Sequence, residues 1–463
     1  MPIMKRAKSV VPEREKPKEK IVSIVKDVER SKLDNITTEQ MVKKVKPYCP
    51  EDMVSVNTSG GILSRSFMVG QYNTPDLINL QIRGYVDFYG GYAKHTREVL
   101  SGLEKTGKVC TRLTAIPSPR DIDPMTASKM DWYSTNPAFR LKGSTFLSIA
   151  GPGHMREDKI PQDNRRKIGW TMIETQGVQP RIVDWLNNMD EIWAPTNIDI
   201  ARFEKAGVNN VYHMPLGYDE TMWHPHVKPI ELSGLQGRYI FGVLGSWNTR
   251  KSVKEIVQAY VKEFASSDNT TLLLCCKYGT RKWGTEEEMA DDERWCIKYE
   301  LEKYIAETGI HEDRVPHIAI IDIPLHPNAM PHLAARFDSI VGFSKGESTW
   351  LPGLEVGALK KPIIQLASDC SGFMDYLHDN PYMCKDVKYL EADKELYEGT
   401  SEYYKGQKLA HGNTDELSQM MRQVYMEKGT AKQNQICDHI YYDNIMHRTW
   451  NKTIDLMLDR LTV

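Results

Sequence analysis

Short apolar runs of strand length alternate with amphipathic segments of helix length through most of the chain, and this alternation constrains the fold more than any other feature. It runs first from residue 78 to residue 217 and starts again at residue 238. Repeated strand–helix–strand units predict parallel sheets whose two faces are covered by helices. Two such units in series predict two doubly wound, Rossmann-like α/β domains, in which ligands bind beyond the carboxyl ends of the strands.

The boundaries of the expected elements follow from the apolar period and from turn residues. The strand candidates of the first unit are 78–88, 108–116, 145–151, 167–174, 190–196 and 211–217. Its expected helices are 93–105 and 197–206, the second of which ends at Gly207. The second unit is expected to alternate through strand 238–245, helix 252–265, strand 271–276, helix 285–308, strand 317–322, helix 329–336 and strand 338–343.

A chain of 463 residues is too long for one ordinary core, so two domains with a cleft between them are expected. We expect an N-terminal domain over 51–230, a C-terminal domain over 231–430, and a helix within 431–463 that packs back on the N-terminal domain. Residues 1–50 are rich in Lys and Glu and poor in aromatics, which predicts a mobile charged tail. Its basic start also fits contact with nucleic acid, although charged tails are most often solvated.

The composition demands neither a nucleic acid nor a membrane as partner. The formal net charge is −2, and the longest apolar runs, such as 271–276, are far too short to cross a bilayer. No signal peptide opens the sequence, so a soluble, cytoplasmic protein is expected, in the host cytoplasm if the source is viral. The eight cysteines lack the spacing of metal ligands and are expected to be reduced thiols.

Two segments of the alternating pattern carry residues suited to binding phosphate. Gly90 and Gly91 stand where a strand should end and a helix begin, so that backbone amides can approach a phosphate closely. Arg250 and Lys251 follow a strand that is expected to end at Gly245, which puts two cations at the mouth of the second sheet. For each segment taken alone, an ordinary glycine turn or a solvated lysine is the commoner explanation.

A third segment places two carboxylates around a turn. Glu347 follows an apolar strand, and Glu355 comes after seven intervening residues, in a helix that Pro352 is expected to begin. Glu355 is expected in the opening turn of that helix, where it suits a vicinal diol, and Glu347 suits sugar hydroxyls. The alternative is helix capping, because acidic residues near a helix N-terminus are stabilising.

Taken in order, the Gly-Gly loop, the Arg-Lys pair and the two glutamates resemble the retaining GT-B glycosyltransferases, in particular the large family 4. The segment 190–225 is similar to the family's strand, helix and crossing between domains, and 174–193 resembles its "ET…W…LN" lead-in. The resemblance covers residues 80–460. It implies a GT-B fold, in which two Rossmann-like domains face each other across a cleft.

The resemblance also implies roles for the residues that hold the donor diphosphate and ribose. Gly90 and Gly91 would lie against the diphosphate, Lys251 with Arg250 beside it would neutralise it, and Glu355 would hold the ribose hydroxyls.

On the same resemblance, three further features would face the donor sugar. Glu347 would contact the sugar, and the backbone amides of Thr349, Trp350 and Leu351 would lie near sugar and phosphate. His154 resembles the histidine that such enzymes place near the sugar, although a lone histidine is as often structural.

The chain departs from the family pattern at several positions. The family usually reads Glu-Gly-aromatic-Gly-Leu-Pro, whereas this chain has Ser348 and Trp350 in place of the two glycines. Ser252 replaces the usual glycine after the lysine, and the arginine often found before the Arg-Lys pair is absent. Without the glycines the backbone cannot approach the donor as closely, and Trp350 is a candidate for stacking instead. The departures are compatible with a different donor or a weakened site.

The activity implied by the resemblance is transfer of a hexose or similar sugar from a nucleoside-diphosphate sugar to an acceptor hydroxyl, with retention. Fixed cations and amides would stabilise the leaving diphosphate. No cofactor and no metal is expected, since no Asp-x-Asp stands in a phosphate-facing position after a strand. No separate catalytic base is expected, because the acceptor proton would pass to the leaving phosphate.

By the resemblance, the N-terminal domain is expected to hold the acceptor and the C-terminal domain the nucleotide-sugar donor. The identity of the acceptor is the part that the sequence leaves open. A glycan or a lipid-linked intermediate is one alternative, and a hydroxymethylated base in DNA, as with phage glucosyltransferases, is another that the basic residues 165–167 would suit. A non-catalytic sugar-nucleotide-binding protein is the rival of a different class, motivated by the lost glycines. A phosphorylase on the same fold is less expected. The sequence gives no indication of oligomeric state.

Overall fold

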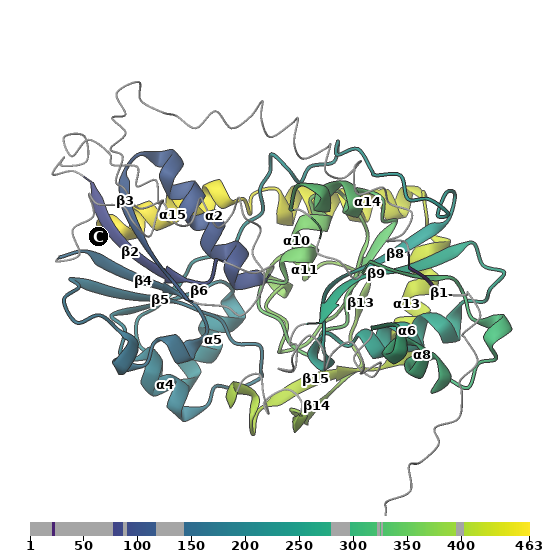
Figure 1. The fold of residues 1–463 in the computed structure, drawn as a ribbon, viewed down its shortest axis with the longest axis horizontal. Helices are drawn as coiled ribbons and strands as arrows, with labels where there is room; N and C mark the ends of the chain where they lie inside the picture. The colour runs from purple at the N-terminus through teal and green to yellow at the C-terminus, as the bar shows by residue number, and fades with distance from the viewer. Residues whose placement is uncertain are drawn as a thin grey trace, which may run out of the picture.

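A computed structural model of the chain describes residues 21–23, 77–86, 90–116, 143–278, 297–321, 325, 327–394 and 402–463. Figure 1 shows two α/β bodies side by side, with the purple and blue N-terminal elements in one and the green elements in the other. The architecture of two doubly wound parallel-sheet domains is therefore as predicted. The expected tail, apart from 21–23, lies outside the described residues, and so does the end of the first predicted strand, at 87–88.

The N-terminal domain is built on a parallel sheet with the strand order β3-β2-β4-β5-β6-β7 in the described residues. Helices α2 (Gly91–Thr106), α4 (Pro180–Leu186) and α5 (Asn197–Ala206) cover it. α5 begins where the Thr196 side chain accepts a hydrogen bond from the Asp199 amide, and it ends at Gly207 in the left-handed conformation. The strands are β2 (Ile78–Gly84), β3 (Val109–Ala115), β4 (Thr145–Ile149), β5 (Arg166–Trp170), β6 (Glu191–Ala194) and β7 (Val211–His213).

The C-terminal domain has a second parallel sheet, with the order β1-β10-β9-β8-β11-β12-β13 among the described strands. Its edge strand β1 (Ile21–Ser23) comes from the segment that was expected to be a tail, and it pairs with β10. The other strands are β8 (Tyr239–Trp247), β9 (Thr270–Tyr278), β10 (Ile318–Ile320), β11 (Ser339–Val341), β12 (Ile363–Leu366) and β13 (Met383–Cys384). Helices of this domain are α6 (Val253–Glu263), α8 (Ile297–Ala306), α9 (Met330–Ala335), α10 (Leu351–Gly357), α11 (Met374–Leu377) and α13 (Thr414–Met426).

Two further elements connect the halves. An antiparallel hairpin, β14 (Val387–Glu391) and β15 (Lys408–Gly412), follows the second sheet and had no counterpart in the sequence prediction. After α14 (Ala431–His439), the last helix α15 (Trp450–Thr462) crosses to the N-terminal domain, where Figure 1 shows it in yellow beside α2. There Arg460 pairs with Glu191 at 3.0 Å.

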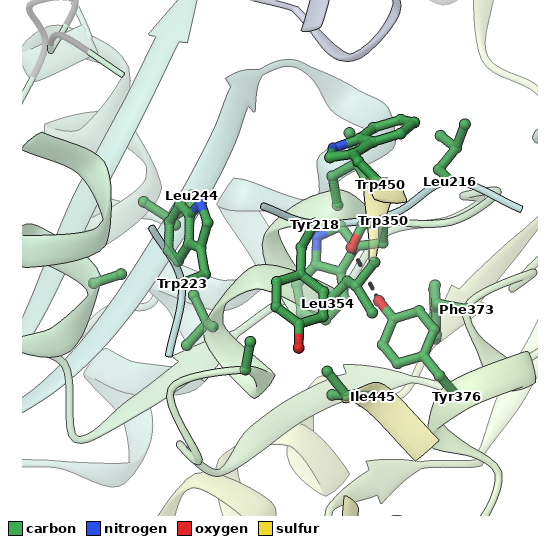
Figure 2. Packing of buried hydrophobic residues seen from close by; sticks show 14 of the residues in the cluster. Leu216, Tyr218, Trp223, Leu244, Trp350, Leu354, Phe373, Tyr376, Ile445 and Trp450 are labelled. Carbon is green, nitrogen blue, oxygen red and sulfur yellow. Dashed lines mark hydrogen bonds between the residues drawn. The ribbon is translucent and has the colours of Figure 1, made fainter. Parts of the chain in front are cut away.

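One hydrophobic cluster runs through both domains and the segment between them. Figure 2 shows Tyr218 of the connecting segment beside Trp350 and Leu354 of the C-terminal domain, with Trp223 of the same segment beside Leu244 and Trp450 of α15 nearby. All six side chains are buried. Burial of aromatic surface on this scale favours a fixed arrangement of the two domains, and it positions the loops at the carboxyl ends of both sheets against each other.

Candidate functional site

The Arg250–Lys251 pair lies in a single 3₁₀ turn (Thr249–Lys251) directly after β8, at the carboxyl end of the second sheet. The Asn248 side chain begins this turn by accepting a hydrogen bond from the Lys251 amide. Next in the sheet, β11 ends at Val341 and leads into the loop that carries Glu347. Because adjacent parallel strands end at the same edge, the cations and the carboxylate meet there.

Glu347 is the centre of this cluster. Its Oε1 contacts Lys251 Nζ, lies 3.0 Å from Arg250 NH1, and accepts a hydrogen bond of 2.9 Å from the Ser344 hydroxyl. Burial alone would raise the pKa of Glu347, but the charges of Lys251 and Arg250 outweigh it and lower that pKa. Glu347 is therefore an ionised carboxylate whose Oε1 has three partners. The structure thus brings together three residues for which the sequence predicted a common site.

Glu355 is held from the other domain. Its carboxylate pairs with Lys94 of α2, which lies three residues after Gly91, and the two side chains are 9% and 28% exposed. Glu355 is the fifth residue of α10, so it lies in the second turn and not, as predicted, in the opening turn. No side chain caps α10, which argues against the capping interpretation of either glutamate.

The loop between the two glutamates presents unused hydrogen-bond donors. Within the described residues, no acceptor is found for the backbone amides of Thr349, Trp350 and Leu351. The Thr349 hydroxyl is buried and likewise has no partner in that part of the chain. The Tyr376 hydroxyl donates to the carbonyl oxygens of Thr349 at 2.9 Å and Trp350 at 3.0 Å, which fixes the orientation of these peptides (the second bond is the dashed line in Figure 2). Buried donors without acceptors are uncommon and indicate a place for a polar ligand.

Two positions at which the family pattern has glycine are left-handed here. Trp350 has φ of 50° and Ser252 has φ of 55°, a region that favours glycine. The Trp350 indole is 5% exposed and packs beside Phe373, with ring centroids 5.7 Å apart. A Cβ on Gly353 would approach this indole to 2.1 Å, so the space for the ring exists because residue 353 lacks a side chain. The prediction that Trp350 stacks on a ligand is therefore wrong for this conformation, since the ring is part of the core.

Sequence reasoning missed a carboxylate from the N-terminal domain. Glu174 Oε1 lies 3.1 Å from Arg250 NH2, and its Oε2 accepts a hydrogen bond from the Tyr404 hydroxyl. Arg250 NH1 also donates to the Gly346 carbonyl at 2.6 Å. Burial alone would lower the pKa of Arg250, but Glu174 and Glu347 outweigh it and raise that pKa above its usual value. The guanidinium of Arg250 thus bridges the domains, whereas Lys251 contacts only Glu347 in the described residues.

A second contact between the domains explains the serine at position 348. The Ser348 hydroxyl donates to Asp199 Oδ2 at 2.5 Å, and Asp199 is fully buried at the start of α5. Burial raises the pKa of Asp199 to about 6, against the opposing effects of Arg202 and Ser348. A glycine at 348 could not make this bond. The residue that departs from the family pattern therefore holds the glutamate loop against the N-terminal domain.

The remaining predicted residues, Gly90, Gly91 and His154, belong to the N-terminal domain. Gly90 precedes α2 and Gly91 begins it, and a Cβ on Gly91 would meet no atom within 4 Å among the described residues. His154 Nε2 lies 2.9 Å from the Tyr85 hydroxyl, and the neighbouring Gly153 amide donates to the Tyr403 hydroxyl at 2.9 Å. No direct contact joins His154 to the glutamate loop in the described part of the chain.

Two searches of the described residues bear on cofactors and membranes. No group of three or more His, Cys, Asp or Glu side chains is arranged to hold a metal ion in this part of the chain. None of the helices in the described ranges has the length and apolar character needed to cross a bilayer.

Comparison with known proteins identifies the fold. Neither a protein-family model nor a sequence of a curated protein matches the chain. By structure, the chain is similar to α,α-trehalose 6-phosphate synthase from Burkholderia multivorans, with a TM-score of 0.56 and 11% identity over 83% of this chain and 98% of the other. It is also similar to sucrose-phosphate synthase from Thermosynechococcus elongatus, with a TM-score of 0.54 and 12% identity over 83% and 98% of the chains.

A third similar structure was solved with a ligand. It is the UDP-forming α,α-trehalose-phosphate synthase from Burkholderia xenovorans in complex with glucose-6-phosphate, with a TM-score of 0.55 and 12% identity over 83% of this chain and 99% of the other. Together these likenesses confirm the predicted GT-B fold. At this level of identity they establish the fold and leave the activity to be argued from the site.

Proposed function

We propose that the protein is a retaining glycosyltransferase that moves a hexose or similar sugar from a nucleoside-diphosphate sugar to an acceptor hydroxyl. The observation that carries the proposal is the loop from Glu347 to Leu351, which combines an ionised glutamate, two cations at its side and unpaired amides. The names of the similar structures describe sugar-phosphate synthases, one of them UDP-forming, and this supports a nucleotide-sugar donor.

In this proposal each group has a defined task. The Lys251 ammonium, with three N–H donors and a single carboxylate partner among the described residues, would turn from Glu347 to the donor diphosphate. Glu347 and the amides of Thr349 and Trp350 would bind sugar hydroxyls and phosphate oxygens, and Glu355 would bind the ribose diol. The charge that develops on the leaving diphosphate would then meet fixed donors, which lowers the barrier by electrostatic preorganisation.

Arg250 has a different task from the one that the resemblance implied. Its guanidinium contacts Glu174, Glu347 and the Gly346 carbonyl, so it organises the loop and the domain contact. We assign direct neutralisation of the diphosphate to Lys251 and the positioning of Glu347 to Arg250. No residue is assigned as catalytic base, and His154 is assigned to the sugar side of the cleft.

The test is a screen of UDP-, GDP-, ADP- and TDP-sugars for binding, followed by measurement of slow nucleoside-diphosphate release. Lys251→Ala and Glu355→Ala should each abolish release while circular dichroism shows an intact fold. Lys262→Ala is the matched control, because this exposed lysine of α6 lies 3.8 Å from Asp415 on the surface. Full activity in either site variant would refute the assigned roles.

A non-catalytic sugar-nucleotide-binding protein is the second candidate. It is favoured by one observation, namely that Trp350 and Ser252 hold left-handed conformations where the family pattern has glycine. Such a protein would bind a donor in the same screen but would release no nucleoside diphosphate with any sugar. Release from any one donor would exclude it.

A further inference from the structure

The carboxyl end of the first sheet carries a group of cationic and polar side chains that the donor site does not use. Arg83 lies next to the last residue of β2, and Tyr85 follows directly after the strand. Arg83 NH1 donates to the Lys159 backbone carbonyl at 2.5 Å. The Tyr85 hydroxyl lies 2.9 Å from His154 Nε2. The end of β2 and the segment 154–159 thus meet at the carboxyl end of the first sheet.

Among the described residues, no carboxylate is found to compensate the charges of this group. No ion pair of Arg83 or of Lys159 is found within the described residues, and Arg83 makes only the one hydrogen bond. The nearest acid in sequence that forms an ion pair, Asp158, is already engaged by Arg156, with bonds of 2.9 and 3.0 Å. Every cation of the glutamate loop, by contrast, contacts a carboxylate.

Burial and the charges of Lys159 and Arg83 act together on His154. Burial, and after it the charges of Lys159 and Arg83, lower the pKa of His154 to about 4. Its Nδ1 is buried and has no hydrogen-bond partner in the described part of the chain. Arg83 and Lys159 thus lie beside the neutral imidazole of His154, and an anion would neutralise their charge. Phosphate matches arginine and lysine in hydrogen-bond geometry and in charge.

We propose that Arg83 and Lys159, with His154 and Tyr85 beside them, bind a phosphate group carried by a small acceptor molecule. The position is suited to this, because ligands of doubly wound domains lie beyond the carboxyl ends of the strands. The group also adjoins the contact between the domains, since the Gly153 amide next to His154 bonds to Tyr403 of the C-terminal domain. The inference rests on the proposed function, in which the N-terminal domain holds the acceptor, and it narrows the acceptor class to phosphorylated compounds.

The experiment measures binding of inorganic phosphate and of glucose 6-phosphate to the full chain by calorimetry, with glucose as the uncharged comparison. Loss of one charge-assisted contact is expected to weaken binding about tenfold in Arg83→Gln and in Lys159→Gln. Arg83→Lys keeps the charge and should retain most of the affinity. Arg156→Gln is the matched control, because this exposed arginine is paired with Asp158. Its affinity should stay within about twofold of the wild type.

Several results would overturn the proposal. Equal affinity of the wild type for glucose and glucose 6-phosphate would do so, and so would unchanged phosphate affinity in folded Arg83→Gln and Lys159→Gln. An equal loss in Arg156→Gln would show a diffuse charge effect. Duplex DNA binding that the two variants abolish, without binding of glucose 6-phosphate, would assign the cations to a nucleic-acid backbone instead.

A last comparison separates this inference from the donor assignment. The phosphate titration is repeated in Lys251→Gln, which removes the cation assigned to the donor diphosphate. Unchanged binding of glucose 6-phosphate in this variant supports two independent anion sites. Loss of binding there would mean that the phosphate probe occupies the glutamate loop, and the N-terminal site would be rejected even if the donor assignment holds.

Discussion

Replacement of Trp350 gives the most direct test of how the glutamate loop is built. The indole is 5% exposed, and truncation of such a buried ring to alanine costs roughly 3–5 kcal/mol of unfolding free energy. The residue also sits at φ of 50°, where a side chain is strained and glycine is not. Glycine should therefore be more stable than alanine at this position by about 1 kcal/mol, the reverse of the order found in helices and strands.

Equilibrium urea unfolding of Trp350→Ala and Trp350→Gly would measure both quantities. We expect Trp350→Ala to be less stable than the wild type by about 4 kcal/mol and Trp350→Gly by about 3 kcal/mol. An alanine variant as stable as the glycine variant would refute the strain, and a glycine variant as stable as the wild type would refute the packing role. If both variants keep the stability of the wild type but no longer bind a donor, the indole has the stacking role that was predicted from the sequence.

Four further outcomes follow from the structure. Ser252→Gly relieves a left-handed serine and should stabilise the protein by roughly 0.5–1 kcal/mol in the same urea assay; a loss of stability would contradict this. His95 is fully buried without a hydrogen-bond partner among the described residues, and burial lowers its pKa to about 3. Its contribution to the free energy of unfolding is therefore complete above pH 6.5 and falls on acidification. When the pH is lowered from 7 to 5, the unfolding free energy of the wild type should fall by about 2 kcal/mol more than that of His95→Phe in the same urea assay. Asp199 acts in the opposite sense, because its pKa is raised to about 6. Its contribution to the free energy of unfolding is complete below pH 3.8 and is lost as the pH rises through 6. In the wild type this loss lowers the unfolding free energy by about 3 kcal/mol over that range, and Asp199→Asn should abolish it. Glu174→Gln should tighten UDP binding roughly threefold to tenfold, since it removes a negative charge beside the cluster that is proposed to hold the diphosphate; weaker binding would mean that Glu174 only orients the Arg250 guanidinium.

The strands and most helices could be predicted because their apolar periods are regular and their ends carry turn residues. β8 and α5 begin within one residue of the predicted positions, and Gly207 ends α5 as expected. The hairpin of β14 and β15 was not predicted because its two five-residue strands show no regular apolar alternation. β1 was not predicted because a strand of three residues within a charged segment is too short to show an apolar alternation.

The residues of the candidate site also fall into those that the sequence predicted and those that it did not. The sequence order of Arg250, Lys251 and Glu347 placed them at one sheet edge, where the structure finds them in contact. Lys94 and Glu355 are 261 residues apart, and no local pattern indicates a pair that forms only when two domains meet. Glu174 could have been noticed from the sequence, since it opens the "ET" segment that is similar to the family lead-in. A resemblance in the order of motifs does not, however, indicate that Glu174 pairs with Arg250. The roles of Gly90, Gly91 and His154 stay predictions.

The pairing of the charges connects ligand binding to the contact between the domains. Lys94 and Glu174 belong to the N-terminal domain, and each is paired with a residue of the C-terminal domain, Lys94 with Glu355 and Glu174 with Arg250. On the proposed function, Glu355 binds the donor ribose and Arg250 positions Glu347. Separation of the domains would break both ion pairs and expose Glu355 to the ribose, which would replace Lys94 as its partner. The domain contact and the donor therefore compete for Glu355, so the strength of the Lys94–Glu355 pair sets part of the donor affinity.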